Sequence, residues 1–156
     1  MMSAVMSRPG PEARLQVISF RLEPELLGFE LHHLEKVIEP GAMSFVPRVP
    51  SFIRGAVNLR GKVVAVVDLR DFFAMSPGEI TIDSRALILA SETYHLGFLV
   101  DRVERIESVP RSGPLVQFPD PSDANPYVSR VINLGGRILN LIDVDKILME
   151  MENYFI

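Results

Sequence analysis

Apolar and polar side chains alternate along most of the chain with the two-residue period that is typical of β-strands. Residues 15–22 show the alternation, and residues 26–31, 85–91 and 94–100 repeat it as further strands. Residues 102–109 continue the pattern, and we expect them to form bent β structure. The hydrophobic pattern therefore predicts a protein built mainly from short strands.

The stretch FIRGAVNLRGKVVAVVDLRDFF, residues 52–73, predicts a strand, a tight turn at Arg60 and Gly61, a second strand and a short helix. Gly61 suits the turn because glycine adopts positive φ without steric cost. The unbroken apolar run at residues 63–67 is typical of a strand that is covered on both faces. Asp68 precedes the helical pattern, and we expect its carboxylate to cap the helix by accepting hydrogen bonds from backbone N–H groups.

The same design returns 75 residues later, in residues 127–144. Equivalent positions carry the same residue in the first strand, at the turn and at the helix cap. The identical pairs include Asn58 and Asn133, Leu59 and Leu134, Gly61 and Gly136, and Asp68 and Asp143. Gly136 is therefore the expected turn glycine of the second unit, and Asp143 is its expected helix cap.

A second correspondence, at an offset of 69 residues, matches Leu27-Gly28-Phe29 with Leu96-Gly97-Phe98. The order strand, strand, bend, strand, turn, strand, helix therefore occurs twice within a domain at residues 13–152. The two halves lie at about residues 14–76 and 84–150. About five strands in each copy predict an all-β protein of two small barrels packed together, with a short helix after each repeat motif.

Four segments lie outside this repeated pattern. Residues 1–12 carry two prolines and a glycine without periodicity, which predicts a disordered N-terminal lead. Residues 45–50 contain two prolines and are expected to be an extended connector or an edge strand. Residues 111–126, with four prolines, are typical of an exposed loop. A C-terminal helix is expected after Asp143, and residues 153–156 are expected to fray as a tail, with docking of Tyr154, Phe155 and Ile156 on the body as the alternative.

The composition argues against several functional classes. The chain has 156 residues, a net charge of −4 and no run of basic residues, so nucleic-acid binding by phosphate neutralisation is not expected. It has no cysteine and therefore no disulfide, thiol nucleophile or zinc–thiolate site. No apolar run approaches the roughly 20 residues of a membrane-spanning helix, and the N-terminus lacks the apolar core of a secretory signal. We expect a cytoplasmic protein that does not insert into a membrane.

Asp68 and Asp143 are the first candidates for chemistry, because two equivalent aspartates in two β units are similar to the dyad of an aspartic protease. Each aspartate, however, is followed by a helical segment and not by the small hydroxyl-plus-glycine turn of a protease dyad. The capping role is therefore favoured for both. An aspartate-dependent hydrolase is the alternative from a different functional class.

The histidines and the glycine pair do not predict a ligand site. His32 and His33 are adjacent at a strand end and point to opposite sides, so they and His95 are expected to be solvated and not to bind a metal. Gly135-Gly136 lies in a turn and matches neither glycine pattern of phosphate-binding loops. We predict no catalytic residue, no metal site and no cofactor.

Basic residues near the first turn are the remaining candidates. Arg54, Arg60, Lys62 and Arg70 lie on or beside the predicted hairpin. Two interpretations are open: a solvated rim, or a partner-facing ridge whose arginines bind carboxylates of another protein with bidentate hydrogen bonds. Two barrels would also leave a groove between them, in which an amphipathic helix of a partner could lie with its apolar face down.

With these residues described, residues 13–150 resemble the CheW family of chemosensory coupling proteins. The most specific part is residues 52–70, which are similar to the family pattern F-I-x-G-x-x-N-L-R-G-x-x-x-P-x-x-D-L-R. Leu27-Gly28-Phe29 and Val100-Asp101-Arg102-Val103 also resemble the family. The chain departs from the family pattern at Ala65 in place of proline, Lys36 in place of an acid and Arg130 in place of a frequent glycine.

The resemblance implies two five-stranded SH3-like barrels around a shared apolar interface, without catalysis. It implies an adaptor that couples the cytoplasmic tips of chemoreceptors to the regulatory domain of a CheA-type histidine kinase, recruited to receptor arrays at the inner membrane. By analogy with the family, Arg60 contacts the receptor, and Leu31, Leu34 and Lys36 belong to the partner surface. The alternative within this class is a CheW-like regulator of another chemosensory pathway, such as surface motility. The strands exchanged between the barrels are left open.

Overall fold

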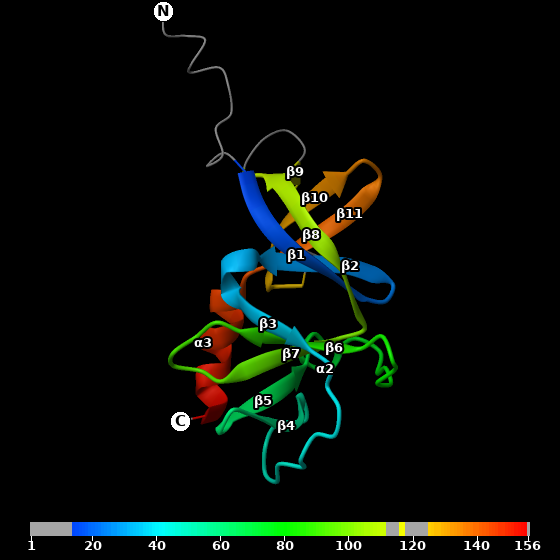
Figure 1. Cartoon of the computed structure of the whole chain (residues 1–156). Helices are drawn as coiled ribbons and strands as arrows, with labels where there is room; N and C mark the ends of the chain where they lie inside the picture. The colour runs from blue at the N-terminus through cyan, green and yellow to red at the C-terminus, as the bar shows by residue number, and fades with distance from the viewer. Residues whose placement is uncertain (1–13, 112–115, 118–124, 156) are drawn as a thin grey trace, which may run out of the picture.

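The computed structural model describes residues 14–111, 116–117 and 125–155. Its strands form two sheets, which lie one above the other in Figure 1. The expected lead at residues 1–12 lies outside the described residues, and so does most of the expected loop at residues 111–126.

The upper sheet in Figure 1, here called lobe 1, contains the first two strands and the last four. Their bounds are β1 Arg14–Leu22, β2 Glu25–Glu30, β8 Arg102–Pro110, β9 Val116–Gln117, β10 Val128–Leu134 and β11 Arg137–Ile142. The strand order is β8-β1-β2-β11-β10-β9, antiparallel except for the parallel pair β2 and β11. Since β9 has 2 residues, lobe 1 consists of five full strands and a short addition at one edge.

The lower sheet, here called lobe 2, contains the five strands from the middle of the chain. Their bounds are β3 Leu34–Ile38, β4 Ile53–Leu59, β5 Lys62–Asp68, β6 Arg85–Leu89 and β7 Leu96–Val100. The order is β3-β6-β7-β5-β4, and the one parallel pair is β5 and β7. The expectation of an all-β fold with two five-stranded units is confirmed.

The two lobes exchange strands. Through the sequence repeat, the order β8-β1-β2-β11-β10 of lobe 1 corresponds to β3-β6-β7-β5-β4 of lobe 2. Lobe 1 takes β1 and β2 from the first half and its other strands from the second half, while lobe 2 takes β6 and β7 from the second half. The halves at residues 14–76 and 84–150 are therefore not separate lobes, because each half contributes to both.

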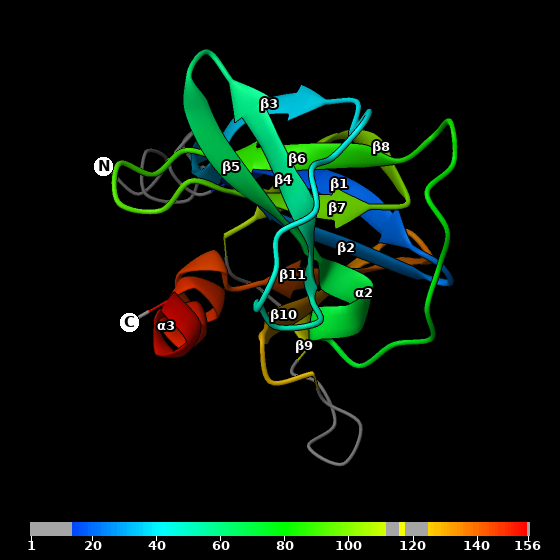
Figure 2. The ribbon, with the colours of Figure 1, turned by 90° about the horizontal axis from the view of Figure 1, so that it is seen from below.

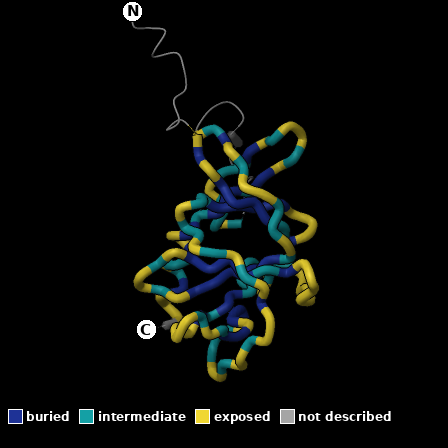
Figure 3. Tube along the Cα trace, viewed as in Figure 1, coloured by how far each residue is buried: buried dark blue, intermediate teal, exposed yellow. Residues whose placement is uncertain are grey.

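Three clusters of buried side chains form the core, and Figure 3 shows the buried residues running along the strands of both sheets. Strands of lobe 1 alone form the cluster of Leu15, Val17, Leu26, Val109, Ile132, Leu139 and Leu141. Strands of lobe 2 alone form the cluster of Val64, Val66, Ala86, Ile88 and Leu99. The third cluster joins the lobes: Phe29 of lobe 1 and Phe98 of lobe 2 are fully buried, with ring centroids 6.0 Å apart in an edge-to-face contact.

Three helical segments complete the described chain. They are the 3₁₀ turn η2 Leu31–His33, the short helix α2 Leu69–Phe72 and the C-terminal helix α3 Val144–Phe155. Seen from below in Figure 2, α2 and α3 lie on either side of the segment that leads into β10. The helices α2 and α3 each directly follow one of the two aspartates that the repeat placed at a helix start.

The C-terminal helix packs as its apolar period predicts, with Val144, Ile147 and Met151 buried. The helix continues to Phe155, so that it includes residues 153–155. The ring of Tyr154 packs edge to face on Phe52, with centroids 5.2 Å apart, and this contact anchors the last turn.

Two further segments refine the predictions. Val63 was expected to be covered on both faces of its strand, but it is 64% exposed. It lies next to the turn, where β5 extends beyond the interlobe core, while Val64 is buried inside lobe 2.

Residues 45–50 form a connector and not an edge strand. The preceding Ser44 makes an isolated bridge to Ala56 with N···O distances of 2.9 Å.

Candidate partner-binding surface

The turn between β4 and β5 is a two-residue turn in which both central residues have positive φ. Arg60 has a φ of 54° and Gly61 a φ of 84°. This combination is typical of a type I′ turn, whose twist matches that of the flanking strands. The Asn58 side chain stabilises the turn, since its Oδ1 accepts a hydrogen bond from the Gly61 N–H at 3.0 Å.

The turn between β10 and β11 repeats this geometry with glycine at both positions. Gly135 and Gly136 have φ angles of 62° and 98°, and Asn133 Oδ1 accepts from the Gly136 N–H at 2.8 Å. Arg60 therefore occupies a left-handed position where its repeat equivalent is glycine. A side chain there costs about 1 kcal/mol relative to glycine, so the arginine is not explained by the turn itself.

The Arg60 turn borders a hollow of about 220 Å³ at one end of lobe 2. Lys62 follows the turn, Lys36 comes from β3, and both line the same hollow together with Glu35 and His95. The structure thus brings together three of the cations that the sequence analysis assigned to the partner surface. They come from the β4–β5 hairpin and from β3, which pairs with β6 and lies more than 20 residues before the turn in the chain.

The charged side chains around this hollow have no ionic partner in the part of the chain that the structure describes. Among the described residues, no hydrogen bond or ion pair is formed by the side chains of Arg60, Lys62, Lys36 or Glu35. Arg60 and Lys62 are also exposed to solvent. The four side chains are therefore available to a binding partner without breaking internal contacts.

At the equivalent end of lobe 1, the arginine that corresponds to Lys62 is paired with two carboxylates. Arg137, the equivalent of Lys62, lies 3.1 Å from a Glu107 oxygen and 3.2 Å from Glu104, the equivalent of Glu35. Glu104 also pairs with Arg21 at 3.2 Å and with Arg102 at 3.0 Å. Burial raises the pKa of the Glu104 carboxyl, but the Arg21 hydrogen bond and the arginine charges outweigh it, so the pKa lies below its usual value.

Arg54 and Arg70 do not belong to the same cluster as Arg60. Arg54 Nη1 pairs with Asp68 Oδ2 at 3.0 Å, at the end of the hairpin that is remote from the turn. Arg70 pairs with Asp101 at 2.9 Å, and its Nε donates to the Ser76 carbonyl at 2.8 Å. The structure therefore does not bring the four cations together, because Arg54 and Arg70 are paired with carboxylates at the base of the hairpin.

The predicted contact residues of η2 and β3 lie on two different faces: Leu31 and Leu34 on one, and Lys36 on the other. Leu31 and Leu34 are partly buried against the core between the lobes. An irregularity in the pairing of β3 with β6 lies between Leu34 and Lys36. Lys36 pairs with Ile88, whose side chain belongs to the interior of lobe 2, and it therefore faces the hollow. One strand thus supplies both an apolar interlobe face and a charged rim.

Asp68 and Asp143 are engaged with their own helices. Asp68 Oδ1 accepts from the backbone N–H groups of Arg70 at 3.0 Å and Asp71 at 3.4 Å, which is N-cap geometry. Asp143 Oδ1 accepts from the Lys146 N–H at 3.0 Å. Within the described residues no hydrogen bond joins the two carboxylates, so they do not form the shared-proton pair of an aspartic protease.

The histidines also lack a ligand-binding geometry. His32 Nε2 lies 3.5 Å from a Glu30 oxygen, and the His33 ring packs edge to face on Phe29. Burial and the neighbouring His32 charge lower the pKa of His33. In the part of the chain that the structure describes, no three histidine, aspartate or glutamate side chains lie close enough to hold a metal ion.

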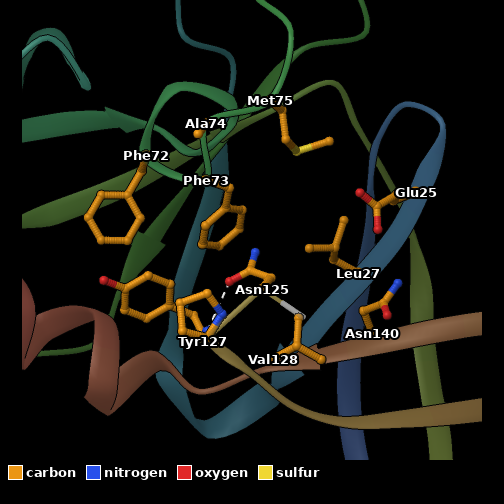
Figure 4. A pocket seen from close by; sticks show the side chains of 11 residues that line it. Glu25, Leu27, Phe72, Phe73, Ala74, Met75, Asn125, Tyr127, Val128 and Asn140 are labelled. Atoms are coloured by element: carbon orange, nitrogen blue, oxygen red, sulfur yellow. Dashed lines mark hydrogen bonds between the residues drawn. The ribbon is translucent and has the colours of Figure 1, made fainter. Parts of the chain in front are cut away.

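A second hollow, of about 440 Å³, lies where α2 ends and was not identified from the sequence. We call it the α2 pocket. Figure 4 shows Phe73 and Tyr127 on one side of it, and Glu25, Leu27 and Asn140 on the other. The Phe73 and Tyr127 rings are stacked at 5.9 Å with an interplanar angle of 26°. The feature of the sequence that could have indicated this pocket is the internal repeat, because it places the aromatic residue Tyr127 at the position equivalent to Phe52.

No helix among the described residues is long and apolar enough to cross a membrane.

Comparisons with known proteins agree with the fold and the turn motif. The family described as CheW-like domain matches residues 16–152. The chemotaxis protein CheW of Thermotoga maritima is 29% identical over 137 residues, covering 87% of this chain and 89% of that protein. CheW of Bacillus subtilis is 31% identical over 105 residues, covering 66% and 67%. The protein FrzA of Myxococcus xanthus is 26% identical over 147 residues, covering 93% and 89%.

The crystal structure of the scaffolding protein TtCheW from Thermoanaerobacter tengcongensis matches with a TM-score of 0.73 and 26% identity, covering 88% of each chain. The family match spans nearly the whole described chain and includes the Arg60 turn, both caps and the exchanged strands. The chain therefore belongs to the CheW-like family and is an adaptor of chemotaxis signalling.

Proposed function

We propose that this protein is a non-enzymatic adaptor that couples the cytoplasmic tips of chemoreceptors to the regulatory domain of a CheA-type histidine kinase. The observation that carries the proposal is Arg60. Its side chain is exposed and forms no hydrogen bond or ion pair with another described residue, and its backbone has a strained φ of 54° where the second repeat has glycine. Strained residues that persist in a folded protein are concentrated at functional sites.

The charge asymmetry between the lobes supports the choice of surface. Arg60, Lys62 and Lys36 surround one hollow of lobe 2 without ion pairs among the described residues, whereas in lobe 1 the equivalent of Arg60 is Gly135 and the equivalent of Lys62, Arg137, is paired with Glu104 and Glu107. Unpaired arginine and lysine at a rim favour a partner that carries carboxylates there. An acidic surface on the chemoreceptor or on the kinase would supply these carboxylates.

The apolar face of η2 and β3 supplies the second half of the proposed contact. Leu31 and Leu34 are only partly buried, and Val37 is 40% exposed beside them. Such a face accepts the apolar side of an amphipathic helix, with anchors on successive turns. A helical receptor tip would place its apolar residues here and its acidic residues toward Lys36. The protein would then be cytoplasmic and recruited to receptor arrays at the inner membrane.

Two substitutions at residue 60 test the proposed contact. Arg60→Gly removes the side chain and relieves the strained backbone, as in the second repeat, and Arg60→Glu reverses the charge. We expect both variants to fold, and Arg60→Glu to weaken binding at least about tenfold, or about 1.4 kcal/mol. Isothermal titration against receptor-tip hairpins and CheA regulatory domains from the same genome would measure the change.

Arg48 supplies a matched control. It is also an exposed arginine at positive φ, 59°, and it lies outside the hollow. Arg48→Gly should leave both affinities unchanged. If Arg60→Glu binds both probes as tightly as the unmodified protein, the proposed contact is wrong.

A further inference from the structure

The helices α2 and α3 occupy equivalent places in the two repeats but differ in length. Both start after a capping aspartate, yet α2 has 4 residues and α3 has 12. The chain leaves α2 at Ala74, which has a φ of 57°, and the Met75 N–H donates to the Arg70 carbonyl at 2.8 Å. The first repeat therefore lacks about two helical turns that the second repeat possesses.

The last turns of α3 rest on two aromatic side chains of lobe 2. The Tyr94 hydroxyl donates to the Glu152 carboxylate. The ring of Phe52 packs edge to face on Tyr154. Met151, on the same side of the helix, is fully buried. These contacts show how a helix covers the surface around Tyr94 and Phe52.

The repeat equivalents of those two aromatic residues form opposite walls of the α2 pocket. Glu25 lies 69 residues before Tyr94, and Tyr127 lies 75 residues after Phe52. Among the described residues no long helix lies between them, and the pocket of about 440 Å³ occupies the place in the first repeat that α3 covers in the second. The fold thus contains one helix-binding surface that is filled and one that is open.

The walls of the α2 pocket define the chemistry of an occupant. Phe72, Phe73 and Met75 supply apolar contact, with Leu27 at the base. Glu25 is the one ionised side chain among the described lining residues. It is exposed, and its carboxylate forms no hydrogen bond or ion pair within the described part of the chain. An occupant therefore needs an apolar stripe and a positive charge facing Glu25.

We propose that the α2 pocket binds an amphipathic helix of a partner protein, seated as α3 is seated in the other repeat. The helix carries apolar residues on successive turns and a lysine or arginine at the position equivalent to Glu152. This surface uses none of the residues around the Arg60 hollow, so it is independent of the proposed coupling function.

The probe is a peptide with the sequence of residues 144–155, stapled on its solvent face because so short a helix is marginal alone. Two versions are compared, one with the native sequence and one with Glu152→Lys, each carrying a fluorophore. Anisotropy titration of the full-length protein should show the lysine peptide binding about threefold more tightly, the range of an exposed ion pair. In the variant Glu25→Gln this preference should disappear.

A second variant tests the apolar wall. Phe73→Ala should weaken binding of the lysine peptide at least about fivefold, as removal of a central aromatic contact does. Ile138→Ala is the control, because Ile138 is 46% exposed in lobe 1 and does not line the pocket. The proposal is overturned if neither peptide binds at millimolar concentration. It is also overturned if Glu25→Gln and Phe73→Ala both bind like the unmodified protein, since the peptide would then have displaced α3.

Discussion

Three residues other than glycine have positive φ in the described chain: Arg48, Arg60 and Ala74. Each position would be less strained with glycine, and glycine occupies the equivalent of Arg60 in the second repeat. For Arg60 the turn gives no reason for the cost, and the proposed partner contact of its side chain, which borders the hollow of lobe 2, would supply one. For Ala74 the backbone explains it, because the residue ends α2 in the left-handed conformation that commonly closes a helix.

Ala74→Gly is therefore expected to stabilise the protein by about 0.5–1 kcal/mol, since glycine adopts a φ of 57° without the clash of a Cβ. Urea unfolding would measure the change in the free energy of unfolding. Ala56→Gly is the matched control, because Ala56 lies in strand β4 and is buried. There the same substitution should destabilise by a similar amount. A loss of stability in Ala74→Gly would contradict the strain argument.

Glycines in β2 and β7 show how closely the strands approach their neighbours. A Cβ on Gly28 would lie 2.7 Å from Val17 Cγ1 and 2.8 Å from the Ile18 carbonyl oxygen. A Cβ on the equivalent Gly97 would lie 2.8 Å from Ile88 Cδ1, the flexible end of a side chain, and 3.5 Å from the nearest backbone atom. The two glycines are equivalent in the repeat. A Cβ at Gly28 would press on the backbone of β1, whereas a Cβ at Gly97 would press on the end of a side chain.

Gly28→Ala is expected to cost about 2–3 kcal/mol, because backbone of β1 has to shift in a packed core. Gly97→Ala should cost about 1 kcal/mol, since a rotamer change of Ile88 makes room. Thermal and urea unfolding of both variants would measure the difference. Equal destabilisation of the two would show that the backbone oxygen does not decide the cost.

At the scale of the whole molecule, strand exchange joins the two lobes into one folding unit. Neither lobe can form from one half of the chain, and Phe29 and Phe98 meet in a core shared by both. We therefore expect one cooperative unfolding transition. The network of Glu104 and its arginines reinforces lobe 1 across β1, β8 and β11.

Glu104→Gln is expected to lower the free energy of unfolding by about 2 kcal/mol at neutral pH, since charged hydrogen bonds to three arginines are weakened. The pKa of Glu104 is lowered in the folded protein, so its contribution is present above the unfolded pKa and is lost as pH falls through the folded pKa. The difference between variant and unmodified protein should therefore shrink as pH falls below about 4.5.

Glu35→Gln is the control for this pH dependence. Glu35 is the repeat equivalent of Glu104, but it is exposed and unpaired among the described residues. The substitution should change stability by less than about 0.5 kcal/mol at any pH in this range. A pH-independent effect of Glu104→Gln would contradict the assignment of its stabilising role to the ionised carboxylate.

Features of the candidate site that depend on adjacent residues could be predicted from the sequence, whereas features that depend on residues far apart in the chain could not. The turn at Arg60-Gly61 was predictable because its geometry depends on a few adjacent residues. The pairing of Arg54 with Asp68 was not, because both residues also suit an exposed surface. The α2 pocket was missed for a related reason, since its walls come from four separate segments of the chain.

Strand positions, both hairpin turns, the two helix starts and the internal repeat follow from local patterns, because each depends on residues within a few positions of one another. The exchange of strands depends on contacts between residues far apart, such as β1 with β8 and β5 with β7, which a repeat of identical patterns cannot distinguish. Whether a charged side chain forms an ion pair also depends on residues far apart in the chain. Lys62 and Arg137 are equivalent in sequence, but Arg137 is paired with Glu104 and Glu107, about 30 residues away in the chain, whereas Lys62 forms no ion pair among the described residues.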